Sequence, residues 1–267
     1  MAAPILNPPR HARAVVLGAS NVSRGISTIV ESIRRTLGSN VEILVAAGHG
    51  RSYGIDSRVL ARSVPSILDC GLWSWLASAP PVPSYALVCD VGNDILYGQP
   101  SATILAWVEA CLSRIRQVSA SVAIVGLPMD RLRRLSPIGF RVLSTLLYPT
   151  HRVTFEAAFA AAERVDRGLA DLARDHGARL VVPSDGLYGL DPIHVRTRQA
   201  PAFWRDVLAA WRPDLAPADV PGRSLRRWIA IRSRLPQSCR ILGVPIGGRE
   251  APPGEARFAG GTVVRLF

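Results

Sequence analysis

The fold is decided by residues 14–21, which read Ala-Val-Val-Leu-Gly-Ala-Ser-Asn. Four consecutive apolar residues without polar alternation predict a strand that is buried on both faces, as in a parallel sheet covered by helices. The glycine predicts a turn, and residues 23–37 then carry apolar side chains at helical spacing. We therefore expect a strand, a short loop and a helix in direct succession.

The same alternation continues along the chain. Further strands are expected at residues 42–46, 85–89, 121–125 and 179–182, and further helices at residues 57–68, 102–118, 154–176 and 197–211. Because each strand is apolar along its length, helices must cover both faces of the sheet. The sequence therefore predicts the α/β class, as a three-layer αβα sandwich with a parallel sheet of about five strands.

The composition divides the chain into three parts. We predict an N-terminal tail of residues 1–13, one domain over residues 14–211, and an Arg/Pro/Gly-rich extension of residues 212–267 packed on that domain. Within the domain, residues 130–150 form a connection that is longer than usual and mixes Arg with Leu, Phe and Tyr. Such a segment is typical of a lid or a pocket wall.

The extension contains two recognisable patterns. Residues 224–235 predict a basic amphipathic helix, and a hairpin is expected to turn at Gly260-Gly261. We expect the apolar face of this helix, with Leu225 and Ile229, to pack on the domain while its arginines are solvated. Contact with an anionic membrane surface is the alternative interpretation.

The chain is strongly basic, with 32 basic and 20 acidic residues and a net charge of +12. Every basic residue is an arginine, which indicates a compositional bias, so a nucleic-acid partner is not expected. The absence of lysine excludes P-loop and Schiff-base mechanisms. Four cysteines without a C-x-x-C pair predict buried, reduced thiols and no metal site. Because no apolar run could span a membrane, and Pro and Arg interrupt the first residues, we expect a soluble, cytoplasmic protein.

Chemically useful residues follow four of the five predicted strands. They lie in residues 18–21 (Gly-Ala-Ser-Asn), 48–52 (Gly-His-Gly-Arg-Ser), 90–94 (Asp-Val-Gly-Asn-Asp) and 191–194 (Asp-Pro-Ile-His). In an open α/β sheet, ligands bind beyond the carboxyl ends of the strands. A hydroxyl, two glycines, an amide and a carboxylate with an imidazole are therefore expected to converge on one edge.

These residue types fit nucleophilic catalysis. Ser20 becomes a nucleophile when a base takes its proton, and His194 is the candidate base. Asp191, three residues before His194, can fix the imidazole tautomer and stabilise the imidazolium. The backbone N–H groups of Ser20 and Gly50 and the side-chain amide of Asn93 are candidate donors to a tetrahedral oxyanion.

Together, the four blocks resemble the SGNH (GDSL-type) hydrolase superfamily over residues 14–211. The resemblance implies a flavodoxin-like sandwich and a serine esterase that forms an acyl-enzyme on Ser20, acts on a small-molecule ester and needs neither a metal nor an organic cofactor. His49, Asn21 and Asp94 are expected to line the site. The chain departs from the family at Ala19, where the family usually has Asp, and at Val91, where it usually has Gly. In the family, that Asp steadies the oxyanion loop.

Two other motifs compete for the same segments. Residues 50–54 fit the G-x-S-x-G nucleophile elbow and would make Ser52 the nucleophile, but that elbow normally follows several strands. Residues 18–25 resemble a dinucleotide-binding loop, but Asn21 replaces its middle glycine. An acyltransferase with the same triad, and a non-catalytic anion-binding protein on the same fold, are the alternative functions.

Overall fold

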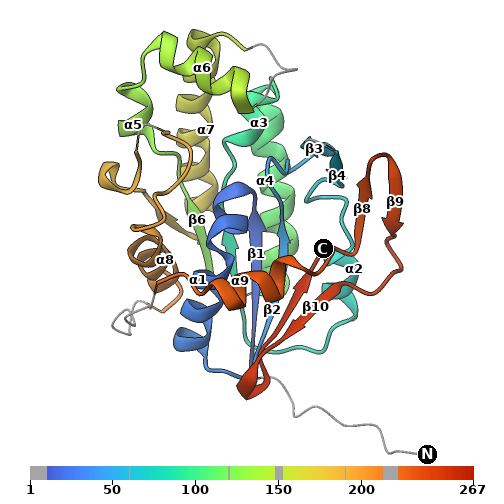
Figure 1. Cartoon of the computed structure of the whole chain (residues 1–267). Helices are drawn as coiled ribbons and strands as arrows, with labels where there is room; N and C mark the ends of the chain where they lie inside the picture. The colour runs from blue at the N-terminus through green and yellow to red at the C-terminus, as the bar shows by residue number, and fades with distance from the viewer. Residues whose placement is uncertain (1–10, 60, 120, 148–152, 190, 213–221) are drawn as a thin grey trace, which may run out of the picture.

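The computed structural model describes residues 11–59, 61–119, 121–147, 153–189, 191–212 and 222–267. Within these residues, helices cover both faces of a seven-stranded central sheet (Figure 1). The strands lie in the order β10 (Gly254–Arg257), β11 (Val263–Leu266), β2 (Val41–Ala47), β1 (Ala12–Gly18), β5 (Ser84–Val88), β6 (Ser121–Val125) and β7 (Arg179–Val181). All neighbours pair in parallel except β10 and β11. The predicted α/β sandwich is confirmed.

Strand β1 lies near the middle of the sheet, and all of its residues are buried. Its side chains alternate between two hydrophobic cores, with Val15 and Leu17 in one and Ala14 and Val16 in the other. Burying apolar surface on both faces stabilises the fold by about 25 cal/mol per Å² removed from water. The uninterrupted apolar run in the sequence reflects this double burial.

The helices divide between the two faces of the sheet. On one face lie α1 (Ser20–Leu37), α8 (Ala200–Ala209) and α9 (Leu225–Arg232), and on the other lie α2 (Leu72–Ser78), α4 (Ser101–Arg116) and α7 (Phe155–Asp175). Three short helices, α3 (Asn93–Leu96), α5 (Met129–Arg133) and α6 (Pro137–Leu147), follow strands β5 and β6 and lie close to α7. They form the upper end of the molecule in Figure 1. None of the described helices is long and apolar enough to cross a membrane.

The prediction of a helix at residues 57–68 is wrong. The chain instead forms β3 (Ser57–Val59) and β4 (Arg62–Val64), which pair antiparallel with each other. Strand β4 also pairs with β8 (Ser238–Ile241), and β9 (Val244–Gly247) completes this small sheet. Pairing with a distant strand therefore overrides the helical spacing of a short apolar run.

The hairpin predicted at Gly260-Gly261 is present between β10 and β11. These strands extend the central sheet, so the predicted number of about five strands is too low. Strand β11 pairs with β2, and the N–H of Phe267 donates to the carbonyl of Val45 at 2.9 Å. Both added strands are only four residues long, and their pairing with the central sheet was not predicted.

The predicted helix in residues 224–235 is present as α9, but its faces are not divided as expected. Leu225 and Ile229 are 61% and 51% exposed, whereas Ile231 is fully buried. Arg227 is not solvated on the outer face, because its guanidinium lies 2.8 Å from Glu31 of helix α1. An ion pair therefore orients this helix in addition to apolar packing.

Candidate active site

Ser20 is the first residue of helix α1 and follows β1 after a single residue. Its Oγ lies 2.9 Å from Nε2 of His194, and Nδ1 of that ring lies 2.6 Å from Oδ2 of Asp191. With the Nδ1 proton directed at the carboxylate, Nε2 is left to accept the hydroxyl proton of Ser20. The fold thus joins the three predicted residues, although 174 positions separate Ser20 from His194.

The Asp191 side chain also shapes its own loop. Its Oδ1 accepts the N–H of Ile193 at 2.9 Å and that of His194 at 3.2 Å, a local turn that Asp favours. Burial raises the pKa of Asp191, but hydrogen bonds from the His194 ring and from these two N–H groups outweigh burial and hold the pKa below its ordinary value. The carboxylate is therefore charged near neutral pH and fixes the orientation of the imidazole.

Asp90 supplies the carboxylate that Ala19 cannot. Its Oδ2 accepts the N–H of Ala19 at 2.7 Å and that of Asn21 at 3.0 Å, on either side of Ser20. Asp90 follows strand β5 and has a left-handed φ of 63°, which directs its side chain under the start of α1. Gly18 permits this approach, since a Cβ there would lie 3.3 Å from the carboxylate and 2.5 Å from Val22. No pattern near Asp90 in the sequence indicates this role, which arises because the parallel strands β1 and β5 end side by side.

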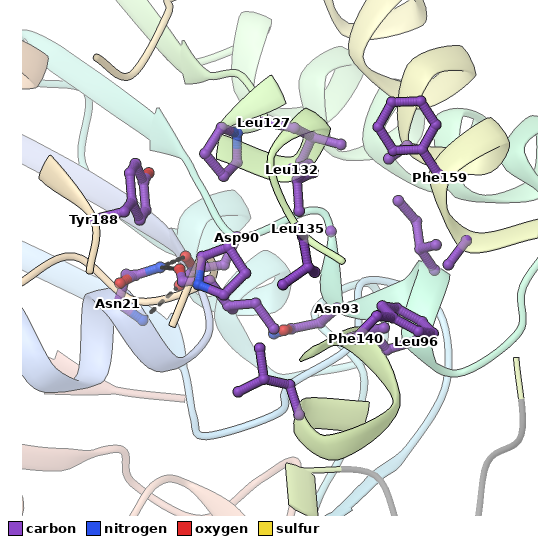
Figure 2. Close-up of a pocket in the computed structure, with 18 of the residues that line it drawn as sticks. Asn21, Asp90, Asn93, Leu96, Leu127, Leu132, Leu135, Phe140, Phe159 and Tyr188 are labelled. Atoms are coloured by element: carbon purple, nitrogen blue, oxygen red, sulfur yellow. Dashed lines mark hydrogen bonds between the residues drawn. The ribbon is translucent and has the colours of Figure 1, made fainter. Parts of the chain in front are cut away.

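Asn21 connects the start of α1 to the loop that carries His194. Its Nδ2 donates to Oδ1 of Asp90 at 2.8 Å and to the carbonyl of Ile193 at 2.9 Å, and its Oδ1 accepts the N–H of Val195 at 2.9 Å. Figure 2 shows the paired side chains of Asn21 and Asp90. Asn21 therefore fixes the distance between the segments that hold Ser20 and His194.

The candidate oxyanion donors come from three neighbouring strand ends. The N–H of Ser20 lies in the first turn of α1, where backbone donors have no partner within the helix. Asn93 is buried at the start of α3, and Gly50 has a φ of 65° that suits glycine. The hydroxyl of Tyr97, just after α3, donates to the carbonyl of Gly50 at 2.6 Å. This contact fastens the loop of Gly50 to the segment of Asn93.

Ser52, the serine of the G-x-S-x-G motif, has no access to solvent. Its hydroxyl donates to Asp94 and accepts the N–H groups of Gly54 and Ile55 at 3.1 and 3.0 Å. Asp94 is also fully buried, so the expectation that it lines the site is wrong. Burial raises the pKa of Asp94 to about 6. Ser52 and Asp94 thus hold two loops together beneath the site and offer no surface to a substrate.

The resemblance of residues 18–25 to a dinucleotide-binding loop also has no structural counterpart. A pyrophosphate would need the N–H groups at the start of the helix. Asp90 occupies those of Ala19 and Asn21. At Gly25, a Cβ would lie 2.2 Å from the indole of Trp204, so this glycine serves close packing between α1 and α8.

A cavity with an apolar wall, here called the apolar cavity, opens beside Asn93 and Asn21 (Figure 2). Leucine and phenylalanine side chains from α3, α5, α6 and α7 and from the loops beside them dominate its lining, among them Leu96, Leu127, Leu132, Leu135, Phe140 and Phe159. The described part of residues 130–150 therefore forms a pocket wall, as predicted. Residues 148–150 of that segment lie outside the described residues.

A second cavity, here called the cationic cavity, lies on the side of His194. Its described lining includes His49, Arg24, Arg223, Trp204 and Trp228, and contains no acidic residue. Helices α1, α8 and α9 and the loops after β2 and before α8 contribute to it. The prediction that His49 lines a cavity at the site agrees with this arrangement, whereas the sequence analysis did not single out the two arginines.

His49 remains uncharged at neutral pH in this environment. Partial burial lowers its pKa, and the charges of Arg232 and Arg24 lower it further. Several cationic groups therefore act on the same small volume.

Among the described residues, no group of three or more His, Cys, Asp or Glu is placed to hold a metal ion, and the four cysteines are buried and form no disulfide.

Comparison with known proteins adds information on the fold. No protein-family model and no curated protein matches the chain. A lipolytic protein of the G-D-S-L family from Veillonella parvula is 13% identical and has a TM-score of 0.50, over 75% of this chain and 98% of that one. The aryl esterase of M. smegmatis is 14% identical with a TM-score of 0.48, over 74% and 99% of the two chains. The SGNH-hydrolase family esterase AlinE4 is 17% identical with a TM-score of 0.42, over 82% and 90%.

At these identities the likeness concerns the fold. The match to the G-D-S-L protein includes nearly all of that chain and leaves about a quarter of this one unmatched. The chain has the fold of the SGNH, or GDSL-type, hydrolases.

Proposed function

We propose that this protein is a serine esterase that hydrolyses a small carboxylic ester through an acyl-enzyme on Ser20. One observation carries the proposal: Ser20, His194 and Asp191 form a continuous chain of hydrogen bonds beside two cavities. The three side chains have the mutual geometry required of a nucleophile, a general base and an orienting carboxylate.

In the first half of the reaction, Oγ of Ser20 attacks the carbonyl carbon of the ester and its proton passes to Nε2 of His194. The carbonyl oxygen becomes an oxyanion, for which the N–H groups of Ser20 and Gly50 and the amide of Asn93 are the donors. Each such donor typically stabilises the transition state by about 3 kcal/mol. The ester C–O bond then breaks, and His194 gives its proton to the leaving alcohol.

In the second half, water attacks the acyl-enzyme while Nε2 of His194 takes one of its protons. The bond between the acyl group and Oγ breaks, the acid leaves, and the proton on His194 returns to Ser20. The sum of both halves is ester and water giving acid and alcohol. Asp191 stays charged throughout and stabilises the imidazolium in each half.

A serine-directed fluorophosphonate probe tests the proposal directly. The wild-type protein should carry a single label on Ser20, identified by peptide mass spectrometry, and should hydrolyse a short 4-nitrophenyl ester. Ser20→Ala should lose both properties, whereas Ser52→Ala is the matched control that should retain labelling. Labelling of Ser52, or hydrolysis that survives in Ser20→Ala, would sink the site assignment. Product analysis with added alcohols distinguishes hydrolysis from acyl transfer.

A further inference from the structure

We propose that the cationic cavity binds a negatively charged group on the alcohol part of the substrate. The preferred substrates are then esters of an apolar acid with an anionic alcohol, one that carries a carboxylate or a phosphate. This inference rests on the proposed esterase function and names the substrate class of that same site.

The position of His194 decides which part of the ester enters which cavity. The leaving oxygen must lie next to Nε2 of His194, because this group returns the proton to it. His194 lines the cationic cavity, whereas Asn93, a donor for the oxyanion, lines the apolar cavity. Asn21, the residue after Ser20, lines both, so both cavities adjoin the start of α1. The alcohol therefore extends into the cationic cavity and the acyl chain into the apolar one.

The charge of the cationic cavity matches an anion. Arg24 lies four residues after Ser20 on α1, which places it one turn further along the same helix face. Arg223 comes from the segment before α9, and its guanidinium lies 4.6 Å from the ring centroid of Trp228. Stacking on an indole holds a guanidinium without consuming its charge. Two guanidinium groups thus line a volume whose described walls hold no carboxylate.

Arg35 of α1 and Arg227 of α9 each have a carboxylate partner, in contrast to Arg24 and Arg223. Glu31 of α1 pairs with Arg227 at 2.8 Å and with Arg35 at 3.2 Å. Within the described residues, no ion pair includes Arg24 or Arg223. Arginine donors without a protein acceptor at the mouth of a cavity are available to a carboxylate or phosphate of a ligand.

Two chromogenic esters test the proposal, 4-nitrophenyl octanoate and 3-carboxy-4-nitrophenyl octanoate. They share the acyl chain and differ by one carboxylate on the leaving group, and each kcat/KM is divided by the rate of hydroxide-catalysed hydrolysis to remove intrinsic reactivity. We expect a preference of about tenfold for the carboxylated ester at low ionic strength, shrinking in 0.5 M NaCl because salt screens exposed charges. Stronger competitive inhibition by inorganic phosphate than by acetate supports a phosphate-bearing alcohol, and the reverse supports a carboxylate.

Variants of Arg24 and Arg223 test whether the preference for the carboxylated ester arises in the cationic cavity. Arg24→Gln and Arg223→Gln should each lower the ratio of the two kcat/KM values by about threefold, and the double variant should bring it near unity. Arg35→Gln, on the same helix but outside the cavity, should keep the wild-type ratio. Thermal unfolding should confirm that all variants are folded.

The results distinguish a failure of the anion-binding inference from a failure of the proposed esterase function. Equal corrected kcat/KM values for the two esters in the wild type, or a preference that survives the double variant, would overturn the inference and leave the esterase function intact. Hydrolysis of neither ester together with no labelling of Ser20 would overturn the proposed function, and this inference with it.

Discussion

Ser20 and Ser52 follow neighbouring strands, β1 and β2, and each is hydrogen-bonded to a functional group that can accept its proton. Ser20 faces the imidazole of His194, whereas Ser52 faces the carboxylate of Asp94 directly. Ser20 is 5% exposed and is followed by Asn21, which lines both cavities, whereas Ser52 is fully buried. A serine in a fitting motif is therefore not a nucleophile unless a base and an approach for substrate accompany it.

The two regions also make different use of the two carboxylates that follow β5, Asp90 and Asp94. Asp90 binds the backbone around Ser20 and leaves the hydroxyl of Ser20 to His194. Asp94 binds the hydroxyl of Ser52 itself and the N–H of Tyr53. Asp90 therefore positions Ser20 for reaction. Asp94 instead occupies the hydroxyl of Ser52 in a hydrogen bond that holds two segments of the chain together.

The largest expected difference between the two serines is in catalysis. Ser20→Ala should lower kcat by about 10⁴-fold or more, because it removes the group on which the acyl-enzyme forms. Ser52→Ala should retain most of the activity of the folded protein. Steady-state hydrolysis of a 4-nitrophenyl ester measures both, and His194→Ala should match the loss seen in Ser20→Ala. Comparable kcat values in the two serine variants would contradict the comparison.

The free energy of unfolding should fall more in Ser52→Ala than in Ser20→Ala. Ser52→Ala removes the donor to Asp94 and the acceptor of two backbone N–H groups in a fully buried place, so we expect it to lower the free energy of unfolding by about 3 kcal/mol. Ser20→Ala should change it by less than about 1 kcal/mol. Urea denaturation of both variants at pH 7.5 measures the two values, and an equal loss would show that Ser52 has no special structural role.

Asp94 should also give the Ser52 region its own pH dependence. Burial raises its pKa to about 6 from an ordinary value near 3.8, so the folded protein holds this proton more tightly than the unfolded chain. The stabilisation that comes from protonated Asp94 is fully present below the pKa of Asp94 in the unfolded chain. It is lost as the pH rises through about 6. Between pH 4.5 and 7.5, the free energy of unfolding of the wild type should fall by about 2 kcal/mol relative to that of Asp94→Asn. Urea denaturation of both proteins at both pH values tests this, and a constant difference would refute it.

What the sequence predicts correctly in this molecule is encoded locally. The five apolar strands of the parallel sheet and the segments that carry Ser20, Asp191 and His194 each show their pattern within a few residues. Residues 57–64 form strands because β8, far along the chain, pairs with β4, and no local pattern contains that partner. The hairpin of β10 and β11 was predicted, but its addition to the central sheet was not, because that addition depends on pairing with the distant strand β2.

The contribution of Asp90 could not be read from its own surroundings either. Its partners are the N–H groups of Ala19 and Asn21, about 70 residues earlier. Only the parallel register of β1 and β5, with Leu17 opposite Val88, brings them together. The replacement of the family's usual Asp by Ala19 looked like a loss in the sequence, but the adjacent strand end supplies a carboxylate at the same backbone.

The smallest expected effect concerns this positioning role of Asp90. Asp90→Asn keeps the shape and tolerates the left-handed φ, but one of its two acceptor oxygens becomes a donor that faces the amide of Asn21. We expect kcat and the rate of fluorophosphonate labelling to fall about tenfold with little change in KM, because the backbone at Ser20 is less preorganised for the oxyanion.

Asp94→Asn is the matched control, since it changes the other carboxylate after β5, which has no contact with the Ser20 backbone among its described hydrogen bonds. It should lower stability and leave the labelling rate of the folded protein unchanged. If both variants slow labelling equally, the effect belongs to the segment after β5 as a whole. The distinction between a carboxylate that prepares Ser20 and one that fixes Ser52 depends on Asp90→Asn slowing labelling while Asp94→Asn does not.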